Sequence, residues 1–124
     1  MAYELLIWKD EGISLEEWEQ AVNNCPLTKI DCSDIQGVNP RTGEVIVVGG
    51  KKGDAAVKFS EGGFLGIGAK VTWEKVFRFA SSYGSFNYSE SMELPDNQVR
   101  IAAAELAKLL GARILGEGDE EYNW

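Results

Sequence analysis

The stretch YELLIWKDEGISLEEWEQAV, residues 3–22, sets the first two elements of the fold. Its opening run, Tyr3–Trp8, is apolar and rich in strand-forming residues, which predicts a buried strand. Ser14 then follows a polar break and stands three residues before Glu17, the spacing of a capping box at the start of a helix. One apolar stripe of that helix comprises Leu15, Trp18, Ala21 and Val22. We therefore expect a strand followed directly by an amphipathic helix.

A second helix is predicted near the end of the chain. It opens at Pro95–Asn97 and ends at Gly111, which stands where a left-handed C-terminal cap belongs. The apolar residues at helical spacing are Val99, Ala102, Ala103, Leu106, Leu109 and Leu110. Residues 112–115 predict a short last strand.

The middle of the chain predicts strands separated by polar turns. The expected strands are 28–32, 44–48, 55–59, 71–79 and 85–89, and the turns are 39–43, 49–54 and 81–84. Trp73, Phe77 and Phe79 share one alternation, and Trp8, Trp18 and Trp73 are each expected to pack in the core. Because long crossover connections are missing, the fold class is α+β in one domain, residues 1–124, with a mainly antiparallel sheet and two helices packed on one face.

The chain has no histidine, and its 20 Asp and Glu residues outnumber 12 Lys and Arg residues for a net charge of −8. Serine or cysteine triads and histidine-ligated zinc are therefore excluded within this chain. Residues 1–34 carry a net −6, residues 35–80 a net +3 and residues 81–124 a net −5. The acidic ends suit a basic partner, whereas nucleic acid would be repelled by the overall field.

Two cysteines, Cys25 and Cys32, are the only thiols. We expect both to be reduced, Cys25 near a helix end and Cys32 in a strand; a disulfide is geometrically possible but disfavoured in a reducing compartment. No apolar run is long enough to span a bilayer and the N-terminus does not have the pattern of a signal peptide, so we expect a cytoplasmic protein that contacts no membrane. No motif calls for a cofactor or a metal.

The glycine-rich segment 61–70 matches neither a phosphate-binding loop nor a dinucleotide fingerprint. We expect a loop or bulged edge there, with Phe64 as an apolar contact for a partner. Acid–base chemistry would need a carboxylate pair with opposed environments. The candidate pairs are Glu16/Glu19, Asp31/Asp34 and Glu117/Asp119, each of which is otherwise an ordinary solvated surface charge.

The last residues, GEGDEEYNW (116–124), contain the densest acidic run, Asp119–Glu121. They are either a frayed solubilising tail or an electrostatic arm that uses Tyr122 and Trp124 as anchors. Tyrosine and tryptophan are favoured at binding hot spots, and charge at the rim of an interface raises the association rate.

Several segments resemble small acidic bacterial immunity proteins of the contact-dependent or polymorphic toxin type. These segments are YELLIWKD (3–10), SLEEWEQAV (14–22), NPRTGEVI (39–46), VFRFASSYGSFNYS (76–89) and DNQVRIAAAELAKLLGARILGEGDEEY (96–122). The resemblance implies a noncatalytic protein that neutralises a cognate toxin C-terminal domain, and it transfers no site residues. The glycine-rich segment 61–70 has no counterpart in the group.

Three functions remain open from the sequence. The first is an immunity protein that binds a toxin, expected to be a cationic nuclease, by covering its active site or an adjacent surface. The second is a noncatalytic interaction or regulatory module, including a nucleic-acid mimic, and the third is a small carboxylate enzyme. For the first, the predicted toxin-binding residues are Asp31, Asp34, Phe64, Asp119, Glu120, Glu121 and Tyr122.

Overall fold

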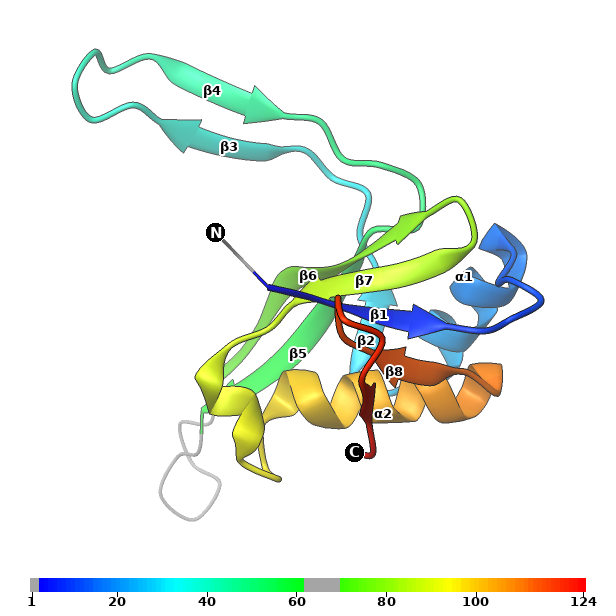
Figure 1. Ribbon diagram of the computed structural model, residues 1–124. Helices are drawn as coiled ribbons and strands as arrows, with labels where there is room; N and C mark the ends of the chain where they lie inside the picture. The colour runs from blue at the N-terminus through cyan, green and yellow to red at the C-terminus, as the bar shows by residue number, and fades with distance from the viewer. Residues whose placement is uncertain (1–2, 62–69) are drawn as a thin grey trace.

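The computed structural model describes residues 3–61 and 70–124, which form a seven-stranded sheet, a separate two-stranded ribbon and two α-helices (Figure 1). In spatial order the large sheet contains β2 (Thr28–Ile30), β5 (Ala55–Glu61), β6 (Lys70–Ala80), β7 (Tyr83–Asn87), β1 (Glu4–Trp8), β8 (Arg113–Leu115) and β9 (Glu121–Tyr122). Its neighbouring strands pair antiparallel throughout. The α+β prediction, with a mainly antiparallel sheet and two helices, is confirmed.

Both helices begin and end as the sequence predicts. Helix α1 (Leu15–Asn24) has a complete capping box, in which the Glu17 amide donates to Ser14 Oγ at 3.0 Å and the Ser14 amide donates to Glu17 Oε1 at 3.2 Å. Helix α2 (Gln98–Leu110) starts at the Asn97 cap and ends at Gly111, whose φ of 64° lies in the left-handed region.

The core lies between the helices and one face of the sheet, and its largest buried side chain is Trp18. The Trp18 ring packs 6.2 Å from the Phe77 ring and 5.8 Å from the Phe79 ring, measured between centroids. A β-carbon on Gly84 would lie 2.5 Å from the Trp18 ring, so glycine is required where β7 passes under the indole. The predicted core position of Trp18 is confirmed.

A bulge in β6 overturns the prediction for Trp73. Ala55 pairs with Phe77 and Ala56 pairs with Lys75, so Val76 is an extra residue in the ladder. An inserted residue reverses which side chains face the core. Phe77 is therefore buried, whereas Trp73 is 37% exposed and carries the Lys29 ammonium 4.4 Å from its ring centroid.

The expectation for Trp8 is also wrong. Leu5 and Ile7 of β1 face the helices, and alternation turns Trp8 to the other face, where it is half-buried 5.9 Å from the Tyr83 ring and outside the core cluster.

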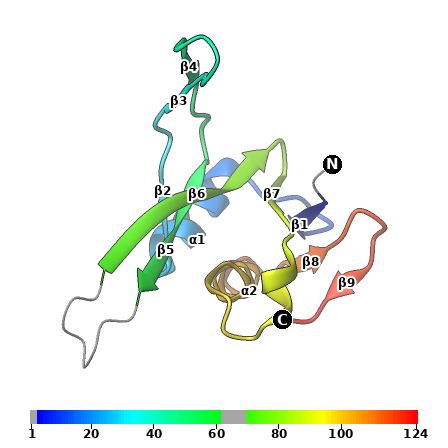
Figure 2. The same ribbon diagram turned by 90° about the vertical axis from the view of Figure 1, so that its left-hand side faces the viewer.

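The two-stranded ribbon of β3 (Ile35–Val38) and β4 (Val45–Val48), joined by the loop 39–44, projects away from the rest of the molecule (Figures 1 and 2). We call residues 35–48 the arm. The turn at 39–43 is as predicted, but strand β3 was not predicted. Cys32, expected in a strand, is instead exposed in the connection between β2 and the arm. Cys25 is buried, and both thiols are free as expected.

Two further elements were not predicted. A 3₁₀-helix η1 (Glu90–Glu93) precedes α2, and the acidic tail returns to the sheet as β9. Across the described parts of the chain, neither helix has the length and apolar character needed to cross a membrane.

Candidate functional site

The structure separates the predicted toxin-binding residues into two groups at opposite edges of the large sheet. Asp31 and Asp34 follow the edge strand β2, in the connection to the arm. The run from Asp119 to Tyr122 lies at the other edge, in the turn before β9 and in β9 itself. Phe64 lies outside the described residues. The sequence alone gave no reason to divide these groups.

Asp31 and Asp34 hold the base of the arm. Asp31 Oδ1 accepts hydrogen bonds from both the amide and the hydroxyl of Ser33, and the hydroxyl is the main reason that the pKa of Asp31 lies below its usual value. Asp34 Oδ1 accepts the amide of Gly50, at 3.0 Å, from the opposite leg of the arm. Their hydrogen bonds therefore fix where the arm leaves the sheet.

The two legs of the arm are also fixed to the sheet. The Asp31 amide donates to the Asp54 carbonyl at 2.7 Å, and Lys75 of β6 binds both the Ser33 carbonyl and, at 3.6 Å, the Asp54 carboxylate. Gly50 packs so closely that a β-carbon would lie 2.1 Å from the Cys32 carbonyl oxygen. The arm is thus held at a defined base.

At the opposite edge, the C-terminal residues form a closed turn and not a frayed tail. The Gly116 amide donates to the Glu120 carbonyl at 2.8 Å, and the Asp119 amide donates to the Gly116 carbonyl at 3.1 Å. Asp119 has a φ of 63°, which the short turn requires. Glu121 lies 3.7 Å from Arg113, so this carboxylate is partly neutralised. Of the two alternatives that the sequence left open for this segment, the frayed tail is therefore the wrong one.

Tyr122 and Trp124 anchor the tail to the protein's own surface. The Tyr122 ring lies 5.6 Å from the Trp124 ring and 6.4 Å from the Tyr88 ring, while Trp124 also packs 6.2 Å from the core residue Phe86. Tyr88 in turn meets Tyr3 edge-on at 6.2 Å. Three tyrosines from distant parts of the chain therefore lie in one row beside the C-terminus.

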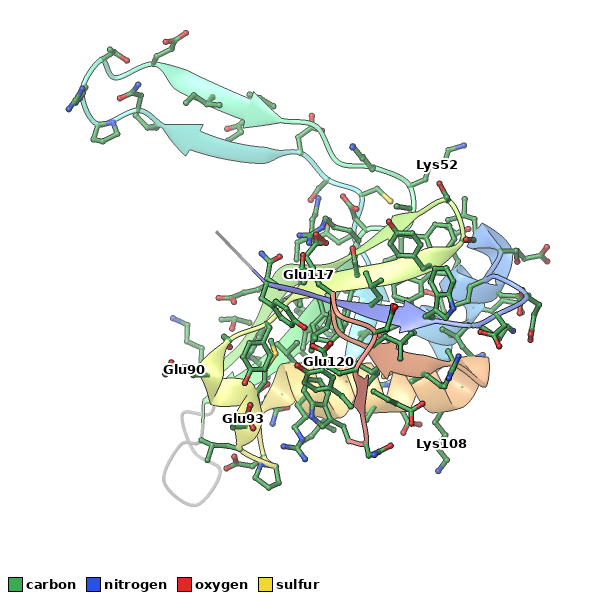
Figure 3. The ribbon with its side chains drawn as sticks, viewed as in Figure 1. Lys52, Glu90, Glu93, Lys108, Glu117 and Glu120 are labelled. Carbon is green, nitrogen blue, oxygen red and sulfur yellow. The ribbon has the colours of Figure 1, made fainter. Side chains whose placement is uncertain are left out.

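Glutamates surround this row. The Tyr88 hydroxyl donates a hydrogen bond to the Glu93 carboxylate, and the Tyr122 hydroxyl donates one to the Glu120 carboxylate at 3.4 Å. The Tyr3 hydroxyl accepts a hydrogen bond from the backbone amide of Glu117 at 3.0 Å. Figure 3 shows Glu90 and Glu93 on η1, and Glu117 and Glu120 in the turn before β9. We call these seven residues the acidic tyrosine surface: Tyr3, Tyr88, Tyr122, Glu90, Glu93, Glu117 and Glu120.

Three of these carboxylates, those of Glu90, Glu93 and Glu120, raise the pKa of a neighbouring tyrosine. The pKa of Tyr88 is raised mainly by its hydrogen bond to Glu93, with a contribution from the charge of Glu90. Burial chiefly raises the pKa of Tyr122, and the charges of both Glu120 and Glu93 raise it further. One phenol therefore lies in the field of carboxylates from both η1 and the C-terminal turn. Sequence reasoning found Glu120 and Tyr122 but missed Tyr3, Tyr88 and the η1 acids, because only the tertiary fold brings them together.

The remaining polar groups are mostly engaged in ordinary surface pairs. A groove of about 460 Å³ beneath the arm has Lys75 and Arg78 in its lining, where Lys75 faces Asp54 and Arg78 lies 3.2 Å from Glu4. On α1, Glu16 is exposed and Glu19 is half-buried. Among residues 3–61 and 70–124, no group of three or more Asp, Glu or Cys side chains is placed to hold a metal ion.

Comparisons with protein-family models, with curated proteins and with solved structures found no match to this chain.

Proposed function

We propose that this chain is an immunity protein, a noncatalytic cytoplasmic inhibitor that binds a cognate bacterial toxin domain through the acidic tyrosine surface. Two lines of reasoning support the proposal: the resemblance of the sequence segments to small acidic immunity proteins, and the chemistry of this surface. The toxin is expected to be a cationic nuclease, since an enzyme that acts on a polyanion presents positive charge that carboxylates can occupy.

One observation carries the proposal: the four glutamates of the acidic tyrosine surface are exposed, and within the described chain none of their carboxylates lies within 4.0 Å of a lysine or arginine nitrogen. The nearby Arg100 guanidinium instead donates to the backbone carbonyl of Glu93 at 3.1 Å. The charge of the four glutamates is therefore free to act on a partner. The tyrosines beneath them are half-buried and held in place by ring contacts, so they offer contact area at little cost in conformational entropy.

The test is binding of the toxin domain encoded beside this chain, with the association rate measured over a range of ionic strength. The site variant is Glu90→Gln, Glu93→Gln, Glu117→Gln and Glu120→Gln together. The matched control neutralises four acids elsewhere, by Glu11→Gln, Glu16→Gln, Glu74→Gln and Glu105→Gln. Both variants change the net charge from −8 by the same amount.

At low salt, we expect the association rate constant of the site variant to be lower than that of the control by a factor of about ten or more. We also expect the rate constant of the site variant to lose most of its dependence on ionic strength. Equal loss in the two variants would assign the effect to overall charge and reject this surface. Turnover of a substrate by the purified chain, or failure of the neighbouring toxin domain to bind it, would reject the proposed function itself.

A further inference from the structure

The arm exposes more apolar side chain than any other described element. Val38 is 65% exposed, Val45 59%, Val47 53% and Ile46 50%. The strands β3 and β4 contain no ionisable residue. A β-branched, uncharged ribbon of this kind is typical of an interface and not of a solvated hairpin.

Both faces of the arm are apolar. The register pairs Val38 with Val45 and Gln36 with Val47, which places these residues on one face, and Gly37 with Ile46 on the other. An isolated two-stranded ribbon is only marginally stable in water. Since β3 and β4 pair only with each other in the described structure, a covering partner would stabilise the arm.

We propose that the arm pairs with the arm of a second copy of this chain, edge to edge through β4, in an antiparallel dimer with twofold symmetry. This proposal does not depend on the toxin-binding function. The arm extends from the rest of the molecule, which we call the body (Figure 2). Two copies can therefore join through their arms while their bodies stay apart. The net charge of each chain is −8. A body-to-body contact would have to overcome the repulsion between these charges.

The backbone of β4 offers the free edge that such pairing requires. The Asn39 amide donates to the Glu44 carbonyl at 2.8 Å, so residue 44 directs its backbone groups toward β3. By alternation, Val45 and Val47 direct their N–H and C=O groups outward. A twofold axis at Val47 therefore lets these groups bond across the dyad.

Charge at the two ends of β4 favours the antiparallel order. Glu44 stands at the tip of the arm, and Lys51 and Lys52 stand beyond its base; all three are exposed. In an antiparallel pair the tip of one arm lies beside the base of the other, which brings Glu44 of one copy near Lys51 and Lys52 of the other, beyond the end of β4 at Val48. A parallel arrangement would instead place Glu44 beside Glu44.

The first experiment measures the mass of the full chain by sedimentation velocity over a concentration series. We expect a monomer–dimer equilibrium, and we expect Val45→Lys with Val47→Lys to yield monomer. The control Val71→Lys alters a valine outside the arm that is 50% exposed, close to the 53% of Val47, and it should leave the dimer intact. A chain that is monomeric at every concentration, or a control that dissociates equally, would reject the proposal.

The second experiment tests the geometry. Glu44→Lys should raise the dissociation constant of the dimer about fivefold or more, because two symmetric contacts become repulsive. The double variant Glu44→Lys with Lys52→Glu should restore the dimer. In a Cys32→Ser background, Val47→Cys should form an intermolecular disulfide on the dyad, whereas Val71→Cys should not. A dimer without rescue or cross-linking would reject β4 pairing. An arm that is protected from hydrogen exchange only when the toxin is bound would identify the toxin as its partner instead.

Discussion

The indole nitrogen of Trp18 donates a hydrogen bond to the carbonyl oxygen of Gly53, 2.7 Å away and inside the core. The bond joins helix α1 to the chain that returns from the arm to β5. Gly53 has a φ of 89° and lies against Phe79, so its carbonyl is fixed where the indole reaches it.

Trp18→Phe should destabilise the fold by about 2–4 kcal/mol, because it leaves the Gly53 carbonyl without its partner and opens space beside Phe77. The measurement is urea unfolding followed by circular dichroism. A change below about 0.5 kcal/mol would show that water or a neighbouring group replaces the bond.

Gly84→Ala should lower the free energy of unfolding by about 1–3 kcal/mol, because the new β-carbon would lie 2.5 Å from the Trp18 ring. Gly37→Ala is the matched control, since a β-carbon at Gly37 has no neighbour within 4 Å. Thermal unfolding of both variants is the measurement. Equal melting temperatures would show that the indole moves aside without cost.

Gly50→Ala should loosen the base of the arm, because its β-carbon would meet the Cys32 carbonyl at 2.1 Å and displace the amide that Asp34 accepts. Hydrogen exchange should become faster in β3 and β4 while α2 stays protected. Gly49→Ala has its nearest contact at 3.8 Å and serves as the control. The same exchange rates in both variants would contradict a fixed base.

Tyr122 should make the stability of the C-terminal turn depend on alkaline pH. Burial and the charge of Glu120 raise its pKa above the ordinary value of 10.0, so the protonated phenol is the form that the fold favours. Its contribution is complete below pH 10 and is lost as the pH rises through the folded-state pKa.

Ultraviolet absorbance of tyrosinate and fluorescence of Trp124 should therefore change together in alkali, at a higher pH than a free tyrosine titrates. Tyr122→Phe should remove that part of the pH dependence of unfolding. An unchanged alkaline transition in the variant would assign the effect to another group.

Local signals predicted the helices well, because the capping box at Ser14 and the left-handed cap at Gly111 depend on neighbours in the sequence. The position of Trp73 could not be predicted in the same way. Strict alternation places it with Phe77, and the bulge at Val76 that separates them is set by pairing with β5.

The strand β4 and the turn of the arm were predicted, but β3 and the exposure of the arm were missed for a related reason. A run such as Val45–Val48 has the same sequence pattern whether it is buried or exposed, and Gln36 and Gly37 weaken the strand signal of its partner. The acidic tyrosine surface joins residues 3, 88 and 122, so only the order of strands in the sheet brings them together. In the C-terminal run, the sequence predicted the acids but not the closed turn that orders them.

Within residues 3–61 and 70–124, β3 and β4 pair with each other and with no strand of the large sheet, so their side chains can be replaced without repacking the core. Substitutions in the arm do not have to preserve the close packing by which Trp18 contacts Phe77 and Gly84. Over generations the arm can therefore diversify rapidly on an unchanged scaffold, and related chains should differ most in this segment and least beneath the indole.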